Sequence, residues 1–167
     1  MKLLPIDADT LGLVVAWLAA SETYKWLDFG MGRQIVPAPM LKLMAAHKHN
    51  CLRLFAPDSD QRPIGVVALS DISQFRTATL WYLLGNRDYQ GRGLTTLAVS
   101  KILDIGFQEL ELNAVQAWTA ASNKGSQRVL LKNGFQPAGR FRQAHVVDGV
   151  PEDRLLFDLT ASDRTGG

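Results

Sequence analysis

Cysteine and histidine are scarce in this chain, with one cysteine and three histidines among 167 residues. The single cysteine, Cys51, excludes a framework of internal disulfides and fits a reducing compartment, so we expect a cytoplasmic protein. The strand-like run around Cys51 favours its interpretation as a small buried hydrophobic residue. The histidines, His47, His49 and His145, show no metal-ligand spacing with Cys51, so we predict no metal site.

Long hydrophobic runs and a large net charge are also missing. No apolar run is long enough to span a bilayer, and Pro5 and Asp7 interrupt the apolar start of the chain, so we expect neither a membrane span nor a secretory leader. A net charge of +2 is too small to favour a nucleic-acid partner. The length suits one domain with a sizeable core.

Hydrophobic periodicity predicts a single α+β domain at residues 1–160, with a mainly antiparallel sheet, and a frayed, flexible polar tail at residues 161–167. Runs of strand character are Lys2–Ile6, Cys51–Ala56, Ile64–Leu69, Thr77–Leu84, Ala114–Thr119, Arg140–His145 and Arg154–Leu159. Helices are expected after a cap at Asp9 or Thr10, from Pro39 to about His47, from Thr95 to about Leu110, and from a cap at Asn123 to about Asn133. Asp148-Gly149 is a strong hairpin signal between the last two strands.

The segment Ser21–Gly30 fits neither the helical nor the strand period. It mixes acidic and aromatic residues, as a loop or short helix that lines a pocket does. A surface loop with aromatic residues beneath it fits equally well. We take Glu22, Tyr24, Trp26 and Asp28, together with Trp81, as candidate substrate-binding residues.

The stretch Tyr89–Thr96 carries the strongest functional signal. Its glycines, Gly91 and Gly93, lie between a predicted strand and a predicted helix. Glycine permits positive φ angles, and the first N–H groups of a helix lack internal partners and lie at the positive end of the helix dipole. Such a turn binds anions, and a pyrophosphate is the natural ligand. A plain tight turn is the alternative for this stretch taken alone.

Several elements in order give the chain a resemblance to the GNAT acetyltransferases, and within them to the Rim-type ribosomal-protein N-acetyltransferases. Gln90–Thr95 resembles the family's acyl-CoA pyrophosphate loop, Asn123–Ser126 its Asn-x-x-Ser element, Val129–Phe135 its helix end closing on Gly-Phe, and Asp148-Gly149 with Asp153 its final hairpin. The resemblance covers about Ile64 to Leu159. It implies a GNAT fold, with about seven strands flanked by about four helices, and acetyl-CoA as co-substrate.

The resemblance also implies which residues hold acetyl-CoA. Gln90, Gly91, Arg92, Gly93, Leu94 and Thr95 would hold the pyrophosphate, backbone groups of Leu83 and Leu84 would bond the pantetheine and polarise the thioester carbonyl, and Asn123 would bond the pantetheine arm. Asn123 is equally compatible with a helix N-cap. Thr95 stands where the family usually has glycine or alanine, and its N–H donation survives if this position is already helical.

The implied reaction is attack of a neutral amine on the thioester carbonyl, which needs an oxyanion donor, a base for the amine and an acid for the leaving thiolate. By the resemblance Ser126 is the acid, with an ordinary helix serine as the alternative. Gln143–Gly149 resembles a Rim-type pattern in which a glutamate precedes the hairpin, and His145 stands at the position of that glutamate. Histidine, with an ordinary pKa of about 6.5, is mostly neutral near pH 7.5, so we predict His145 as the base. An exposed strand histidine is the alternative, with Asp71 and Glu22 as further candidate bases.

The acceptor follows from amine pKa. An α-amine, with a pKa of about 7.7–8.0, needs only a modest base, whereas a lysine side chain costs about 4 kcal/mol to deprotonate. We therefore favour a protein or peptide α-amine. The alternatives are a small-molecule acetyltransferase for an amino sugar, polyamine or antibiotic, and a non-catalytic acetyl-CoA-binding module. The strand ending at Leu159 is compatible with a monomer or a homodimer.

Overall fold

One seven-stranded sheet organises the chain in the computed structural model, which describes residues 1–29, 36–60 and 62–165. Its strands are β1 (Lys2–Leu4), β2 (Cys51–Ala56), β3 (Gly65–Ser70), β4 (Thr77–Leu84), β5 (Ala114–Ala120), β6 (Gln136–Val147) and β7 (Val150–Thr160). The order is β1-β2-β3-β4-β5-β7-β6, and β4 and β5 pair in parallel while the other neighbours are antiparallel. The predicted α+β class and mainly antiparallel sheet are confirmed.

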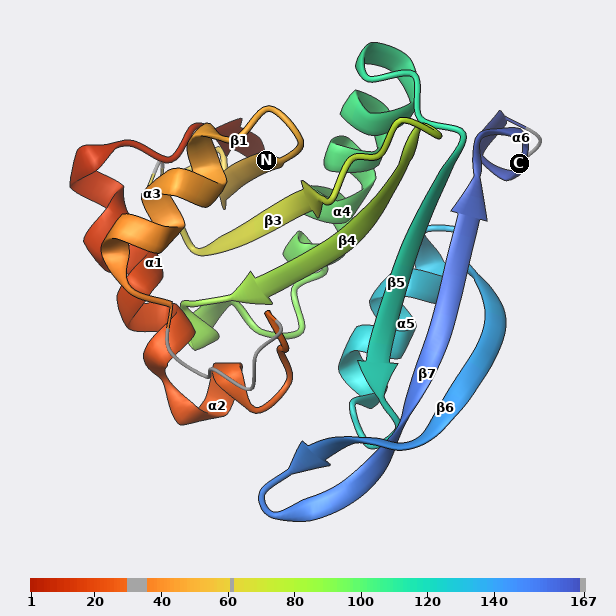
Figure 1. Cartoon of the computed structure of the whole chain (residues 1–167). Helices are drawn as coiled ribbons and strands as arrows, with labels where there is room; N and C mark the ends of the chain where they lie inside the picture. The colour runs from red at the N-terminus through yellow and green to blue at the C-terminus, as the bar shows by residue number, and fades with distance from the viewer. Residues whose placement is uncertain (30–35, 61, 166–167) are drawn as a thin grey trace.

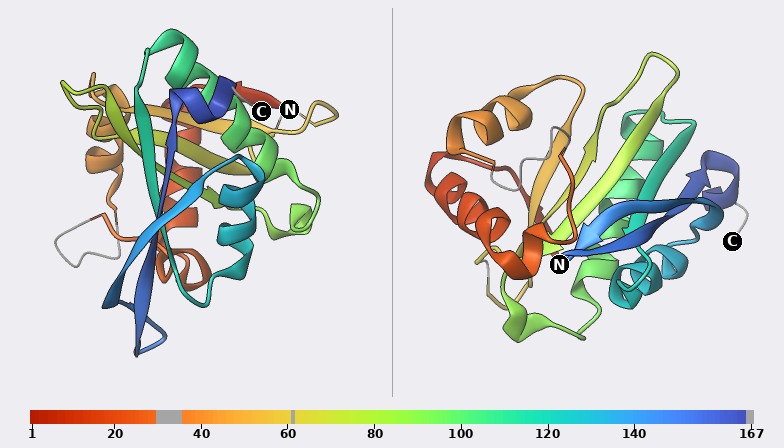
Figure 2. Two further views of the ribbon diagram at one scale, coloured as in Figure 1. Left: turned by 90° about the vertical axis from the view of Figure 1, so that its right-hand side faces the viewer. Right: turned by 60° about the horizontal axis from the view of Figure 1, so that its bottom comes forward.

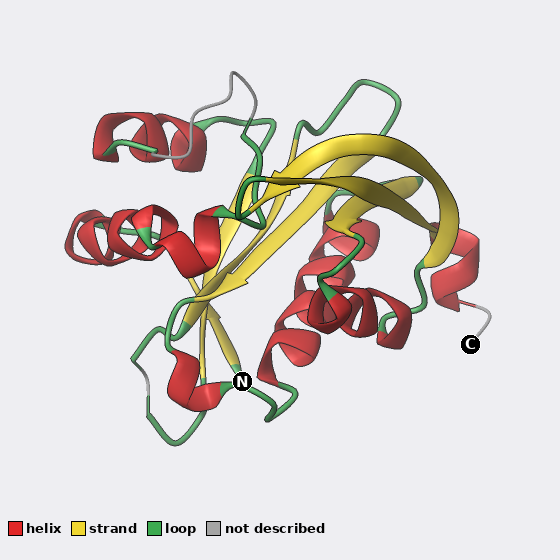
Figure 3. Ribbon diagram, turned by 90° about the horizontal axis from the view of Figure 1, so that it is seen from below, coloured by secondary structure: helices red, strands yellow, loops and turns green. Residues whose placement is uncertain are grey.

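Helices cover both faces of the sheet (Figure 3). They are α1 (Ala8–Ala19), α2 (Ser21–Tyr24), α3 (Ala38–Ala46), α4 (Leu94–Asp104), α5 (Lys124–Lys132) and α6 (Ala161–Thr165), with a 3-10 turn at Arg87–Tyr89 and a π-helical turn at Ile105–Glu109. The described residues thus form six α-helices rather than about four, because α2 and α6 are single-turn helices that hydrophobic periodicity does not reveal.

Each face of the sheet has its own hydrophobic core. Val14, Leu18 and Leu41 of α1 and α3 pack on one face, and Ile102 and Leu130 of α4 and α5 pack on the other. Side chains alternate along a strand, so β4 sends Trp81 and Leu83 to the α1 face and Leu80 and Tyr82 to the α4 face. This alternation places the residues of the candidate site. No helix among the described residues is long and apolar enough to cross a membrane.

The boundaries of two helices differ from the sequence prediction. Asp7, rather than Asp9 or Thr10, is the N-cap of α1: its carboxylate accepts from the Thr10 N–H at 2.9 Å, and the Thr10 hydroxyl accepts from the Asp7 N–H at 3.0 Å. This reciprocal capping box explains why the helix begins at Ala8. The regular part of α4 ends at Asp104, and the π-helical turn carries the chain on to Glu109.

The end of the chain also differs. Polar composition predicts a frayed tail from Ala161, whereas Ala161–Thr165 form α6. The Asp163 carboxylate accepts from the N–H and hydroxyl groups of Thr160, and Arg164 donates to the carboxylate of Asp104 in α4. These bonds were not foreseeable from local composition. Residues 166–167 of the predicted tail and Gly30 of the predicted pocket segment lie outside the described residues.

A long hairpin of β6 and β7 projects beyond the rest of the sheet (Figures 1 and 2). Val147 pairs with Val150 across its turn, and Asp148 and Gly149 have φ angles of 50° and 82°. Two positive φ angles are typical of the turn that Asp-Gly favours, so the predicted hairpin is confirmed.

Candidate active site

A fork between β4 and β5 opens the middle of the sheet. The strands pair at Thr77–Thr79 with Ala114–Gln116 and then diverge, as Figure 1 shows. From Leu80 to Leu84, β4 pairs with β3 alone among the described strands. The main-chain groups on its other edge are therefore available to a ligand.

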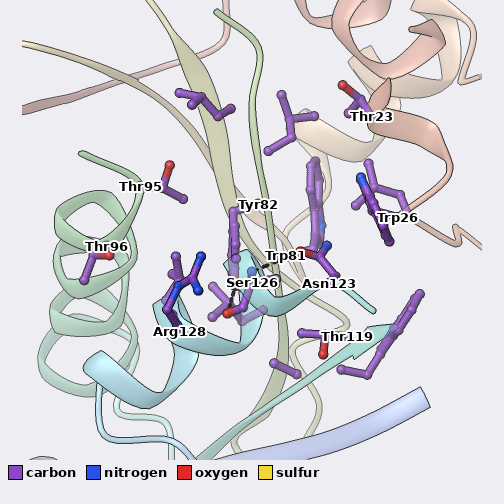
Figure 4. Close-up of a pocket in the computed structure, with 18 of the residues that line it drawn as sticks. Thr23, Trp26, Trp81, Tyr82, Thr95, Thr96, Thr119, Asn123, Ser126 and Arg128 are labelled. Atoms are coloured by element: carbon purple, nitrogen blue, oxygen red, sulfur yellow. Dashed lines mark hydrogen bonds between the residues drawn. The ribbon is translucent and has the colours of Figure 1, made fainter. Parts of the chain in front are cut away.

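A cavity of about 1190 Å³ occupies this fork and reaches both faces of the sheet. On the α4 face it is lined by Tyr82, Gln90, Gly91, Gly93–Thr96, Asn123, Ser126 and Arg128, which we call the loop half. On the α1 face it is lined by Trp26, Phe29, Ser70, Asp71, Thr79, Trp81 and Trp118, which we call the aromatic half. Figure 4 shows Thr95 and Thr96 at one side of the cavity, Thr23 and Trp26 at the other, and Tyr82 and Ser126 between them.

The first turn of α4 is open toward the loop half. Its N-cap is Gly93, with a φ of 74°, and no side chain of the described residues caps it, whereas Asp7 caps α1 and Asn123 caps α5. A Cβ added at Gly91 or Gly93 would meet no described atom within 4 Å. Unbonded N–H groups at the positive end of a helix, with free space before them, form an anion-binding site.

Most residues of the predicted pyrophosphate loop line this opening. Gln90, Gly91, Gly93, Leu94 and Thr95 do so, and Arg92 does not. The Arg92 guanidinium lies 5.0 Å from the centroid of the Tyr89 ring. Thr95 is the second residue of α4, so its position is helical, as its N–H donation requires.

A pair of hydroxyl groups joins β4 to α5 at the centre of the cavity. Tyr82 Oη lies 2.7 Å from Ser126 Oγ and also donates to the Ser126 carbonyl at 3.1 Å (Figure 4). Burial raises the pKa of Tyr82, so the phenol keeps its proton and remains a donor. Sequence reasoning found Ser126 and missed Tyr82, although strand alternation already placed Tyr82 on the α4 face.

Helix α5 contributes further groups to the loop half. Asn123 Oδ1 accepts from the Ser126 N–H at 3.0 Å, so Asn123 is the N-cap of α5 while it also lines the cavity. Lys124, Arg128 and Lys132, spaced four residues apart on one helix face, line the cavity as well. Sequence reasoning missed these three cations, and their spacing is the signal that could have found them.

The predicted acidic ligands at the other end of the cavity have arginine partners. Glu22 pairs with Arg87 at 3.5 Å, and Asp28 pairs with Arg154. Glu22, Asp28, Trp26 and Trp81 line the cavity as predicted, and Tyr24 does not. Glu22 and Asp28, the two carboxylates of the predicted pocket segment, are thus paired with arginines of the same chain.

His145, the predicted base, lies beside the cavity and is not part of its lining. Its Nε2 bonds the Lys25 carbonyl at 2.8 Å, and its ring packs edge-on against Trp118 with 5.0 Å between centroids. A carbonyl oxygen only accepts, so Nε2 carries a proton and is the donor in this bond. This geometry favours a positioning role, through Trp118 and the loop after α2, over direct proton abstraction.

A family profile described as "Acetyltransferase (GNAT) domain" matches residues 1–136. The chain belongs to the GNAT acetyltransferase family. The probable N-acetyltransferase YjcK of Bacillus subtilis is 36% identical over 107 residues, which cover 63% of this chain and 59% of the relative. The [ribosomal protein uS5]-alanine N-acetyltransferase of Escherichia coli is 29% identical over 116 residues, which cover 68% of this chain and 59% of the relative. The chain therefore spans less than two thirds of these relatives' length.

Solved structures share the fold at low identity. The spermidine N-acetyltransferase of Vibrio cholerae, in complex with CoA and spermine, matches with a TM-score of 0.86 and 15% identity over 98% of this chain and 97% of that one. Mycobacterium smegmatis RimJ, in complex with CoA-disulfide, matches with a TM-score of 0.80 and 21% identity over 96% of this chain and 82% of that one. The predicted GNAT fold and the resemblance to ribosomal-protein acetyltransferases are confirmed.

Proposed function

We propose that the protein is an N-acetyltransferase that moves an acetyl group from acetyl-CoA to a primary amine. One observation carries this proposal: the uncapped N-terminus of α4 lies beyond the end of β4, at the open side of the β4–β5 fork. A pyrophosphate held there leads a pantetheine arm into the fork, between the two halves of the cavity. Membership of the GNAT family supports the same activity.

The loop half fits acetyl-CoA in charge and in length. The N–H groups of the Gly91–Thr95 turn would hold the pyrophosphate, and Lys124, Arg128 and Lys132 would face its other negative charges. From Thr79 to Leu84 the strand spans roughly 16 Å at about 3.3 Å per residue. This length accommodates an extended pantetheine along the free edge of Leu83 and Leu84, with Asn123 beside it.

The cavity supplies groups for each step of the transfer. The neutral amine attacks the thioester carbonyl carbon, a C–N bond forms, the C–S bond breaks, and the thiolate takes a proton to leave as the CoA thiol. N–H groups on the free edge of β4 would stabilise the oxyanion. Ser126 would protonate the thiolate, and the single Tyr82 proton would turn from the Ser126 carbonyl to Ser126 Oγ as the serine proton leaves. The amine proton passes to water or to a cavity carboxylate.

The proposed acceptor is the α-amine of a protein or peptide. An α-amine, with a pKa of about 7.7–8.0, is already substantially neutral at physiological pH, so the cavity needs no strong base. This suits a site in which His145 lies outside the lining. Relatives named as ribosomal-protein acetyltransferases support the same acceptor class, at 29% and 23% identity.

Release of CoA thiol from acetyl-CoA tests the proposal directly. The panel comprises peptides with free N-termini, an amino sugar, spermidine and an aminoglycoside, each with and without the protein. Turnover with the peptides is the expected result. Acetyl-CoA binding without thiol release for any amine would contradict catalysis and support a binding module.

A further inference from the structure

The aromatic half has two walls that differ in how their charges are satisfied. The hairpin wall consists of Lys25, Trp26, Asp28 and Trp118, and Arg154 contacts this wall from outside the lining. Lys25 Nζ bonds Asp148 at 3.0 Å and lies 5.3 Å from the centroid of the Trp26 ring. Arg154 pairs with Asp28 and lies 4.2 Å from the centroid of the Trp118 ring. Each charge and each indole ring of this wall therefore has a partner in the chain itself.

The sheet wall consists of Ser70, Asp71, Thr79 and Trp81. The Trp81 indole N–H donates to Ser70 Oγ at 2.9 Å, and Phe29 meets Trp81 edge to face at 5.2 Å. The Asp71 N–H donates to Asn50 Oδ1 at 3.2 Å, which fixes the main chain at this point. Asp71 is an exposed residue that lines the cavity, and its carboxylate has no hydrogen-bond or ion-pair partner within the described part of the chain.

Asp71 lies close to the closed end of the fork. It follows Ser70, which pairs with Thr79, and Thr79 is the last residue of β4 that pairs with β5. A pantetheine that enters from the α4 end of β4 points toward Thr79, where β4 and β5 come together. Among the described residues that line the cavity, Asp71 is therefore the unpaired carboxylate on the acceptor side of the place where a thioester would stop.

We propose that Asp71 binds the ammonium group of the acceptor and that Trp81 and Phe29 contact an apolar group next to it. This inference rests on the proposed transfer to an amine and names the class of amine. The acceptor carries one positive charge beside an apolar or aromatic group, as a peptide with an apolar first residue does. Asp71 holds the protonated amine at the fork, and the amine then passes a proton to water before its lone pair attacks the thioester carbonyl.

The same charges disfavour a polycation as the preferred acceptor. A polyamine or aminoglycoside needs a carboxylate for each ammonium group that it brings into the cavity, because an unpaired charge is costly to desolvate. Glu22 and Asp28 are already engaged by Arg87 and Arg154. On the hairpin wall the charges of Lys25 and Arg154 are balanced by Asp148 and Asp28, so this wall leaves no carboxylate over for a second ammonium group.

The decisive variant is Asp71→Asn, which removes the charge and keeps the shape. With a peptide amide that begins with phenylalanine, kcat/KM falls roughly 10- to 100-fold, the loss expected for one charge-assisted hydrogen bond, and the fall appears mainly in the KM of the peptide. The KM of acetyl-CoA stays within about twofold. The control Asp9→Asn, which removes a carboxylate from α1 outside the cavity, keeps both constants within about twofold.

A binding measurement separates charge recognition from a general loss of structure. The CoA complex is titrated with the phenylalanine peptide and with its analogue in which a hydroxyl replaces the α-amine. The native protein prefers the amine, and Asp71→Asn loses that preference while it still binds the hydroxyl analogue. Equal affinities in the native protein would overturn the inference.

The kinetic panel separates this inference from the proposed function. The expected result is a kcat/KM at least tenfold higher for the phenylalanine peptide than for spermidine. Preference for spermidine, or an Asp71→Asn variant within twofold of the native protein, would overturn the role of Asp71 and leave the N-acetyltransferase intact. Absence of thiol release with every amine would contradict the N-acetyltransferase itself, and the peptide titration would then decide the role of Asp71.

Discussion

The two halves of the cavity are constructed in different ways. In the loop half, the anion site is one short run from Gln90 to Thr96 that presents main-chain N–H groups, and the residue types of this run only have to permit its turn. In the aromatic half, the side chains come from four separate segments: Trp26 follows α2, Asp71 follows β3, Trp81 lies in β4 and Trp118 in β5. A site of main-chain groups is recognisable from a contiguous motif, whereas a site of dispersed side chains is defined only by tertiary contacts.

The largest effect is expected where the loop half depends on a single backbone conformation. Gly93→Val places a β-branched side chain at a φ of 74° and projects it into the space before α4. We expect CoA affinity, measured by isothermal titration calorimetry, to fall by more than about 100-fold, since several N–H donors are displaced together. Gly12→Val, at an exposed position of α1, is the matched control and should bind CoA normally. CoA binding within fivefold of native by Gly93→Val would show that the phosphate lies elsewhere.

The next largest effect is expected for the hydroxyl groups of Tyr82 and Ser126 at the centre of the cavity. Ser126→Ala should lower kcat by roughly 100-fold or more through loss of the acid, and Tyr82→Phe by roughly tenfold through loss of the hydrogen bond that orients it. The double variant should resemble Ser126→Ala alone, because the two groups act as a unit. The CoA dissociation constant of each variant serves as the control. If the losses in kcat of the two single variants add in the double variant, the two hydroxyl groups do not act as a unit.

The turn before α4 and the cap of α5 were predictable from the sequence because their signals are local. Gly91 and Gly93 mark the turn, Asn123 marks the cap of α5, and the order of the elements indicates the family. The missing parts are those that depend on contacts between distant segments. The Asp28–Arg154 pair joins residues far apart in the chain, and no pattern in Ser21–Gly30 reveals that its carboxylates are already engaged.

Sequence reasoning placed His145 by its position in a motif, and the motif gives the residue but not the direction of its ring. The orientation follows from the carbonyl of Lys25, a main-chain atom on another element. Tyr82 was missed for a related reason, since its partner Ser126 lies on α5 and only packing brings them together. Positions in the sheet were thus predictable, and the partners of side chains were not.

A smaller effect is expected at His145, and its size distinguishes two roles. A general base contributes roughly 10²–10⁴-fold, so His145→Ala would cost at least that much if the residue took the amine proton. The hydrogen bond to the Lys25 carbonyl instead predicts that His145→Ala lowers kcat/KM by less than about tenfold, mostly through the KM of the acceptor. The reason is that the loop after α2 loses this hydrogen bond to His145.

The variant His145→Gln sharpens this distinction. Glutamine keeps an N–H donor for the Lys25 carbonyl but offers no basic nitrogen. Recovery of most of the activity relative to His145→Ala, with an unchanged pH–rate profile, is the expected outcome for a positioning residue. Equal and large losses in kcat for both variants would restore His145 as the base.

The smallest effect is expected at the N-terminus of α1, which a side chain caps, in contrast to the N-terminus of α4, which no described side chain caps. Asp7 closes α1, and the Thr10 hydroxyl and N–H that donate to its carboxylate hold the pKa of Asp7 below its ordinary value. A carboxyl group whose pKa is lowered in the folded state stabilises the fold at pH values above its ordinary pKa of 3.8. This stabilisation is lost as the pH falls through the pKa of the folded state. Asp7→Ala should therefore lower the Tm by about 2–4 °C at neutral pH, and the difference from the native protein should narrow in acid. Gly93 caps α4 without a side chain, so removal of bound CoA rather than a change of pH should loosen that helix end. If the difference in Tm between Asp7→Ala and the native protein is the same at neutral and at acidic pH, the carboxylate of Asp7 does not stabilise α1 through its charge.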